Sequence, residues 1–154
     1  MKEFKGRVVV PGTTTASALV SREGFNTLAS FQKSLMFNDK NATCSDQNNN
    51  DLYKKKMANK ALCLPQTIGS TTGGMVLYCA SALGVAPSCL LFSKQIDSLA
   101  AAGAILSDVW TDYNLPTIDS LGDEFLEYVK DGMTIEILSD GVVRVSGDLD
   151  EKNC

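Results

Sequence analysis

The feature that most constrains the fold is a succession of two apolar runs joined by a small polar loop, between residues 60 and 84. Residues 61–64 are apolar and stop at Pro65, which cannot donate a hydrogen bond to a sheet, so we expect a buried strand there. The second apolar run, residues 75–83, is followed by Gly84, and glycine commonly ends a helix. The sequence therefore predicts a strand, a loop and a buried helix in succession.

The loop between the predicted strand and helix is rich in glycines and hydroxyls, with the sequence QTIGSTTGG at residues 66–74. Unpaired backbone N–H groups and the positive end of the helix dipole meet at a helix N-terminus and favour an anion. Two interpretations fit. The loop is either a glycine-rich turn in which Ser70, Thr71 or Thr72 caps the helix, or a site that a small anion can approach closely. It is not a Walker P-loop, because no lysine follows the glycines.

The absence of histidine limits the chemistry of the chain. A Ser-His-Asp triad, a Cys-His pair and a histidine metal ligand are all excluded within the chain. Any acid–base chemistry must use hydroxyls, carboxylates, lysines or groups of another subunit. The chain alone is therefore a poor candidate for a complete enzyme.

Composition also limits the partners. The formal net charge of −4 argues against nucleic-acid binding. No stretch approaches the roughly 18 consecutive apolar residues of a membrane helix, and the first residues do not resemble a signal peptide. We therefore expect a cytoplasmic protein that binds neither nucleic acid nor a membrane.

The five cysteines form no CxxC pair, and an odd number without a secretion signal is typical of reduced thiols. Cys63, Cys79 and Cys89 lie in apolar runs, where cysteine acts as a small hydrophobic residue. We expect no metal ligands in this chain.

The remaining residues predict further strands and helices. Runs of β-branched and apolar residues predict strands at 6–10, 13–21, 88–92 and 115–118. Alternation on either side of Asp140-Gly141 predicts a C-terminal hairpin. Ser120 and Asp123 fit a capping box before a helix over 123–130. A helix is also predicted over 96–110, where apolar residues recur at helical spacing, namely Leu99, Ala102, Gly103, Leu106 and Trp110.

Residues 22–37 fit both a helix and a strand, and the polar residues 38–51 are expected to form a surface loop. Strands come first, then alternate with helices, and then end in a hairpin. This order predicts a single α/β domain with a mixed sheet and flanking helices. We expect the domain to cover residues 1–146 and an acidic tail to cover residues 147–154.

Four segments of the chain carry a resemblance to a known family: GRVVVPG at 6–12, ALVSRE at 18–23, LPQTIGSTTGG at 64–74 and DSLAAAGAILSDVW at 97–110. With them the chain resembles the small subunit of the aconitase X family, a swivelling β/β/α domain. The resemblance covers most of residues 5–146. The family loop reads proline, serine, glycine, arginine, glycine, serine, serine, threonine, glycine. Ser70 keeps this pattern, whereas Ile68 stands at the arginine position.

The resemblance implies that the chain is the small subunit of a hydro-lyase and is inactive alone. It would form at least a heterodimer with a large catalytic subunit, whose cysteines would hold iron or an iron–sulfur cluster, and would itself bind no cofactor. Ser70 would take a proton from the carbon beside the substrate carboxylate. The substrate-binding residues would be Gly69, Thr71, Thr72 and Gly73.

Two substrates stand out in this family, cis-3-hydroxy-L-proline and mevalonate 5-phosphate. A phosphate would favour the positive charge that Ile68 lacks, and abundant asparagine and cysteine disfavour a hyperthermophile. We therefore expect dehydration of cis-3-hydroxy-L-proline. An alternative of another class is a non-catalytic module that holds a small anion in the loop.

Overall fold

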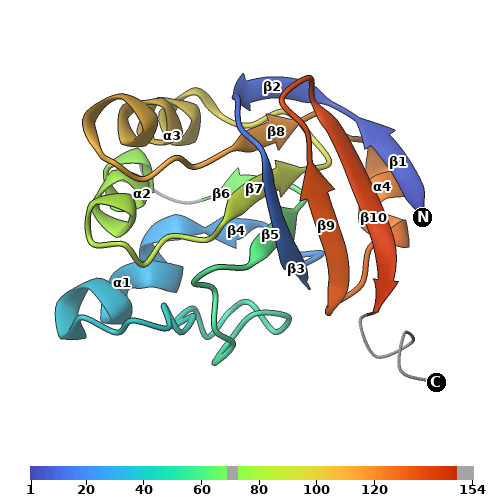
Figure 1. Ribbon diagram of the computed structural model, residues 1–154. Helices are drawn as coiled ribbons and strands as arrows, with labels where there is room; N and C mark the ends of the chain where they lie inside the picture. The colour runs from blue at the N-terminus through green and yellow to red at the C-terminus, as the bar shows by residue number, and fades with distance from the viewer. Residues whose placement is uncertain (69–72, 149–154) are drawn as a thin grey trace.

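The computed structural model describes residues 1–68 and 73–148. Within these residues the chain forms a mixed eight-stranded sheet (Figure 1). Its strands are β1 (Lys2–Lys5), β2 (Arg7–Val10), β3 (Thr14–Val20), β5 (Ala61–Leu64), β7 (Cys89–Phe92), β8 (Thr117–Asp119), β9 (Met133–Ile137) and β10 (Val142–Asp148). Their order in space is β1-β10-β9-β3-β5-β7-β8-β2.

The centre of the sheet consists of the parallel strands β3, β5, β7 and β8, and antiparallel strands flank it on both sides. β5 and β7 read ALCL and CLLF and are buried along their whole length. Continuous apolar sequence is what a parallel strand covered on both faces requires. The strands expected at 61–64 and 88–92 are therefore confirmed, as is the mixed α/β sheet.

The sheet curls because its two edge strands are consecutive in the chain. β1 pairs with β10 at one edge and β2 pairs with β8 at the other, with only Gly6 between β1 and β2. The Gly6 N–H donates to the carbonyl of Gly141 at 3.2 Å, and a Cβ on Gly141 would lie 2.8 Å from the Gly6 oxygen. Gly141 has a φ of +90°, which favours glycine. The hairpin turn thus fits closely against the crossover between the edges.

The short helix α4 (Asp123–Tyr128) fills the inside of the curl. Phe125 of α4 is fully buried and meets the ring of Phe4 edge-on, with ring centroids 5.3 Å apart. Leu126 and the neighbouring Val129 are also buried there. The curled sheet and α4 together enclose one of the two apolar cores.

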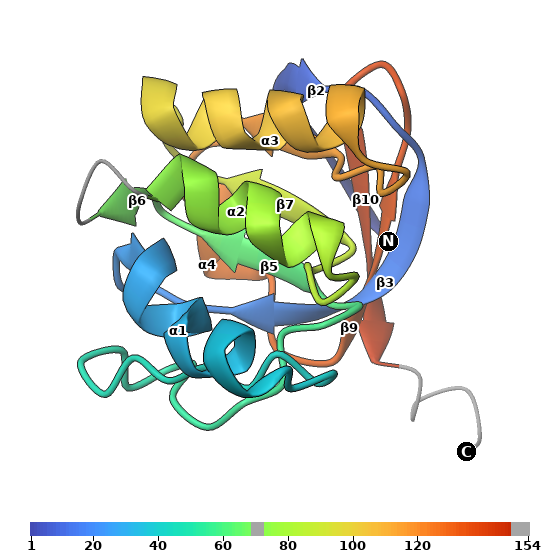
Figure 2. The same cartoon turned by 90° about the vertical axis from the view of Figure 1, so that its left-hand side faces the viewer.

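Three helices cover the other face of the sheet: α1 (Thr27–Phe37), α2 (Gly73–Ala82) and α3 (Ser98–Trp110). α2 lies between the other two (Figure 2). A Cβ on Gly103 of α3 would lie 2.2 Å from the oxygen of Gly74 of α2. The backbones of α2 and α3 therefore touch where α2 begins. The larger core lies under these helices and includes Phe31, Leu62, Leu64, Leu77, Leu90 and Phe92.

Residues 22–37, whose pattern fits both a helix and a strand, form the short strand β4 (Phe25–Asn26) and then α1. The Asn26 side chain caps α1 by accepting a hydrogen bond from the Ala29 N–H at 3.1 Å. The buried positions of α1 are Thr27, Ser30, Phe31 and Ser34. Most side chains of α1 that face the core are polar, so the spacing of apolar residues in the sequence does not reveal the helix.

The capping box predicted at Ser120 and Asp123 is wrong. α4 begins after Gly122 with no side-chain cap, and it ends at Tyr128. The N–H groups of residues 120–122 instead donate to the carbonyls of residues 92–94, at 2.9–3.1 Å. These tertiary hydrogen bonds fix the backbone before the helix and override the local motif.

The segment 38–51 is irregular, as expected, but it is not merely a surface loop. Ala42 and Cys44 are fully buried within the larger core, and the Ser45 N–H donates to the Ser30 carbonyl of α1 at 3.0 Å. At the C-terminus, β10 continues to Asp148, two residues beyond the expected end of the domain at 146. Residues 149–154 lie outside the described part. No described helix is long and apolar enough to cross a membrane.

The contact between Gly74 and Gly103 generates a stability prediction. In Gly103→Ala the added methyl group would overlap the backbone of α2, so we expect the free energy of unfolding to fall by about 1–3 kcal/mol. Thermal denaturation should show a lower Tm. Ala102→Ser, one position away on the exposed side of α3, should change the free energy by no more than about 0.5 kcal/mol. Equal stability of Gly103→Ala and the wild type would contradict the close contact.

Candidate functional site

The predicted loop leaves the carboxyl end of β5 and returns as α2, at the edge of the sheet where the parallel strands end. Ligands of α/β sheets commonly bind outside this edge. Of the predicted site residues, Gly69, Ser70, Thr71 and Thr72 lie outside the described residues. Gly73 is the first residue of α2. The position of the site is therefore defined by the residues that enter and leave the loop.

The entry to the loop is fixed by a second, two-stranded sheet. β6 (Thr67–Ile68) runs parallel to β4, and the Phe25 N–H donates to the Gln66 carbonyl at 2.9 Å. Ile68 lies against Gly24, where a Cβ would be 2.7 Å from Ile68 Cγ2. The segment 24–26 thus holds the backbone from one side, up to the last described residue before the loop.

A side-chain contact fixes the entry from the other side. The Thr67 hydroxyl donates to Asp97 Oδ2, while Asp97 Oδ1 accepts the Ala100 N–H of α3 at 2.9 Å. One carboxylate therefore caps α3 and binds β6. An aspartate just before an apolar helical run signals the cap, but nothing in the sequence indicates its contact with Thr67, thirty positions earlier.

The exit of the loop lies against α1. A Cβ on Gly73 would be 3.7 Å from the Cβ and hydroxyl oxygen of Thr27, the buried first residue of α1. α2 and α3 also begin on the side of the molecule where β6 lies (Figure 2). The first turns of three helices therefore lie at this edge of the molecule. The Asp97 carboxylate offsets the positive end of the α3 dipole, so α1 and α2 are the helices whose N-termini favour an anion there.

Two arginines near this edge are used in structural contacts. Arg22, just after β3, donates to the carbonyls of Leu126 and Val129 at 3.2 and 3.5 Å. Arg7 makes a bidentate pair with the buried Asp119, with distances of 2.6 and 3.0 Å, and this contact raises the pKa of Arg7. Lys94 follows β7, is exposed, and donates its backbone N–H to the Pro65 carbonyl at 3.1 Å. Lys94 is thus an exposed cation whose backbone is hydrogen-bonded to Pro65, where β5 ends and the loop begins.

The buried cysteines are poor candidates for metal ligands. Cys63 and Cys89 are fully buried, and burial raises the pKa of each thiol, so both stay protonated. Across residues 1–68 and 73–148, no three or more cysteine, aspartate or glutamate side chains form a group that could hold a metal ion.

Curated relatives of this chain include two phosphomevalonate dehydratase small subunits. The one from Aeropyrum pernix is 33% identical over 93 residues, which are 60% of this chain and 65% of that relative. The one from Methanocaldococcus jannaschii is 27% identical over 144 residues, which are 93% of this chain and 97% of that relative. The chain thus spans about two thirds of the first relative and nearly all of the second.

Solved structures with the same fold include aconitase X of Thermococcus kodakaraensis in its holo-form. That chain has a TM-score of 0.79 and 26% identity, and the match covers 96% of this chain and 100% of that one. A UPF0107 protein solved by NMR in solution has a TM-score of 0.76 and 24% identity, over 95% of this chain and 100% of that one. These structures confirm the expected swivelling α/β fold.

The family comparison agrees with the structures. A model of the aconitase X swivel domain matches residues 3–145. This range includes residues 69–72, the helices α1, α2 and α3, and the curled sheet. The relatives named above are subunits of an enzyme, which supports the expectation that this chain is part of one. The chain belongs to the aconitase X swivel domain family.

Proposed function

We propose that this chain is the small subunit of a dehydratase and that residues 69–73 complete an active site on a large catalytic subunit. Two findings support this: Thr67 and Ile68, just before these residues, are fixed at the carboxyl edge of the parallel strands, and the curated relatives of the chain are dehydratase small subunits. The contact between Thr67 and Asp97 and the pairing of β4 with β6 would hold the entry of the segment while it enters the partner.

In this proposal Ser70 is the base. As the alkoxide, it takes a proton from the carbon beside the substrate carboxylate, and the electron pair of that C–H bond forms a carbon–carbon double bond. The hydroxyl of the next carbon leaves with its bonding electrons and is protonated to water by an acid of the large subunit. A serine needs help to act as a base near neutral pH, and we propose that the N-termini of α1 and α2 supply favourable potential. Gly69, Thr71, Thr72 and Gly73 would bind the substrate through hydroxyl and backbone N–H groups.

Iron is proposed to belong to the large subunit, because the described residues of this chain offer no suitable ligand group. Bound there, it would supply Lewis-acid assistance to the departing hydroxyl. The contribution of this chain is then the base, part of the substrate-binding surface and the exclusion of water. This division also agrees with the absence of histidine from the chain.

We propose mevalonate 5-phosphate as the first substrate to test, because both curated relatives are named for its dehydration. Lys94, exposed and bonded through its backbone to Pro65, offers a cation at this edge for a phosphate. The second candidate is cis-3-hydroxy-L-proline. It is favoured by Ile68, an exposed apolar side chain at the entry of the loop where the family has an arginine.

Reconstitution tests this proposal. The purified chain, the iron-loaded large subunit and their mixture should each be offered both substrates, with loss of water followed by NMR. We expect turnover only in the mixture, because each chain lacks groups that the other supplies. Turnover by this chain alone, or a tight complex that dehydrates neither substrate, would contradict the proposed function.

The contact between Thr67 and Asp97 generates a second prediction. Thr67→Val keeps the shape of the side chain but removes the donor to the carboxylate, so β6 should hold the loop less firmly. Small displacements in a catalytic site are costly. We expect kcat of the complex to fall about tenfold or more, while the Kd of the two subunits changes less than about threefold.

Thr15→Val is the matched control, because Thr15 is exposed on β3 and pairs with Glu136 of β9, away from the loop. It should leave kcat unchanged. A Thr67→Val complex with wild-type kcat would show that this contact does not position the loop.

A further inference from the structure

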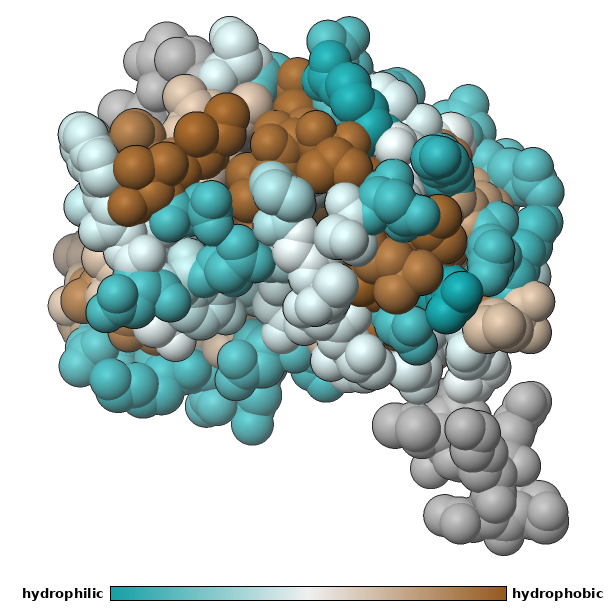
Figure 3. All heavy atoms as spheres, turned by 45° about the horizontal axis from the view of Figure 1, so that its top comes forward, coloured by the Kyte–Doolittle hydropathy of each residue, from teal (hydrophilic) through white to brown (hydrophobic). Residues whose placement is uncertain are grey.

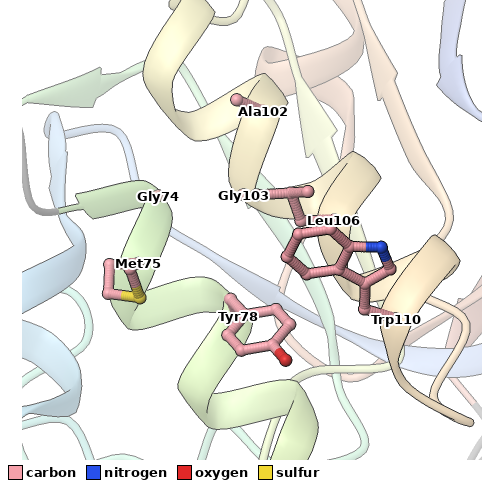
Figure 4. A pocket seen from close by; sticks show the side chains of 7 residues that line it. All are labelled: Gly74, Met75, Tyr78, Ala102, Gly103, Leu106 and Trp110. Atoms are coloured by element: carbon pink, nitrogen blue, oxygen red, sulfur yellow. The ribbon is translucent and has the colours of Figure 1, made fainter.

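The outer surface of α2 and α3 contains an apolar groove of about 290 Å³, which we call the α2–α3 groove. Gly74 and Gly103 lie at its floor, where the two backbones touch. Figure 4 shows that Met75 and Tyr78 border it from α2, and Leu106 and Trp110 from α3. The two helices thus touch at Gly74 and Gly103, and the groove lies along their outer sides from that contact.

The side chains of the groove are unusually exposed for apolar residues. Trp110 is 70% exposed and Met75 is 65% exposed. Val109 and Ile105 are exposed beside them, and Figure 3 shows hydrophobic side chains gathered over the region where α3 lies. Contiguous apolar surface of this kind marks an interaction site. It also explains why Ala102, Leu106 and Trp110, three of the residues at helical spacing in the predicted helix over 96–110, do not face the core. Small residues, Ala100, Gly103, Ala104 and Ser107, occupy the buried side of α3 instead.

The chemistry of the groove matches the centre of a protein interface. The two helices carry a single charged residue between them, Asp108. Interface centres are poor in charge and rich in tryptophan, tyrosine and methionine. The rings of Tyr78 and Trp110 meet edge-on, with centroids 6.5 Å apart, so the aromatic anchors are already ordered before a partner arrives.

We propose that the α2–α3 groove binds an apolar segment of the large catalytic subunit, an inference that rests on the proposed function. The groove begins at Gly74, the residue after the loop segment 69–73 that is proposed to enter the partner's active site. A partner that receives this loop must lie beside the start of α2. The groove therefore continues the same contact surface and takes an uncharged, apolar segment of that partner.

Two measurements test the groove directly. Trp110 is the only tryptophan of the chain, so 5-fluorotryptophan gives a single ¹⁹F resonance. Adding unlabelled large subunit should shift this resonance and shield it from a soluble paramagnetic agent. Trp110→Ala and Leu106→Ser should each raise the Kd of the complex at least about tenfold, while kcat at saturating large subunit stays within about twofold of wild type.

Phe37→Ala is the matched control, because Phe37 is 73% exposed on α1 and lies outside the groove. It should leave the Kd unchanged. Wild-type Kd values in both groove variants, with an unaltered ¹⁹F resonance, would overturn the inference. Self-association of the chain alone that Trp110→Ala abolishes would assign the groove to a second copy and overturn it too. A complex that covers Trp110 but dehydrates nothing would retain the groove and contradict only the proposed function.

Discussion

The backbone contact between Gly74 and Gly103 is the constraint on which the site and the groove both depend. No side chain larger than hydrogen fits at Gly103 without moving the first turn of α2. That turn carries the exit of the loop, and the same contact forms the floor of the α2–α3 groove. Helix packing, loop position and the shape of the outer surface are thus set by one close approach.

Much of the fold could be predicted because its signals are local. Continuous apolar runs mark β5 and β7, and Asp140-Gly141 marks the hairpin. α1 could not be predicted, because serines and a threonine occupy its buried face. The capping box failed because hydrogen bonds to residues 92–94, distant in sequence, decide the backbone before α4. Local patterns therefore succeed where tertiary contacts agree with them, and fail where they do not.

The candidate site shows the same division. Its location, between a buried strand and a helix, follows from the glycines and hydroxyls within residues 66–74 and from Pro65 just before them. The clamp between Thr67 and Asp97 joins two segments that only the fold brings together. The outward direction of Leu106 and Trp110 was equally hidden, because a helical period alone does not say which side meets the core. The chain has no histidine, and we propose that the contact between Thr67 and Asp97 and the α2–α3 groove serve a site shared with a second subunit.

We propose that Ser70 of this chain supplies the base to a site completed by the large subunit. The most direct test is kcat of the reconstituted Ser70→Ala complex, measured together with its assembly by sedimentation velocity. We expect assembly to be retained while kcat falls at least about 100-fold, the usual scale for loss of a general base. Turnover near the wild-type rate in a fully assembled Ser70→Ala complex would contradict it.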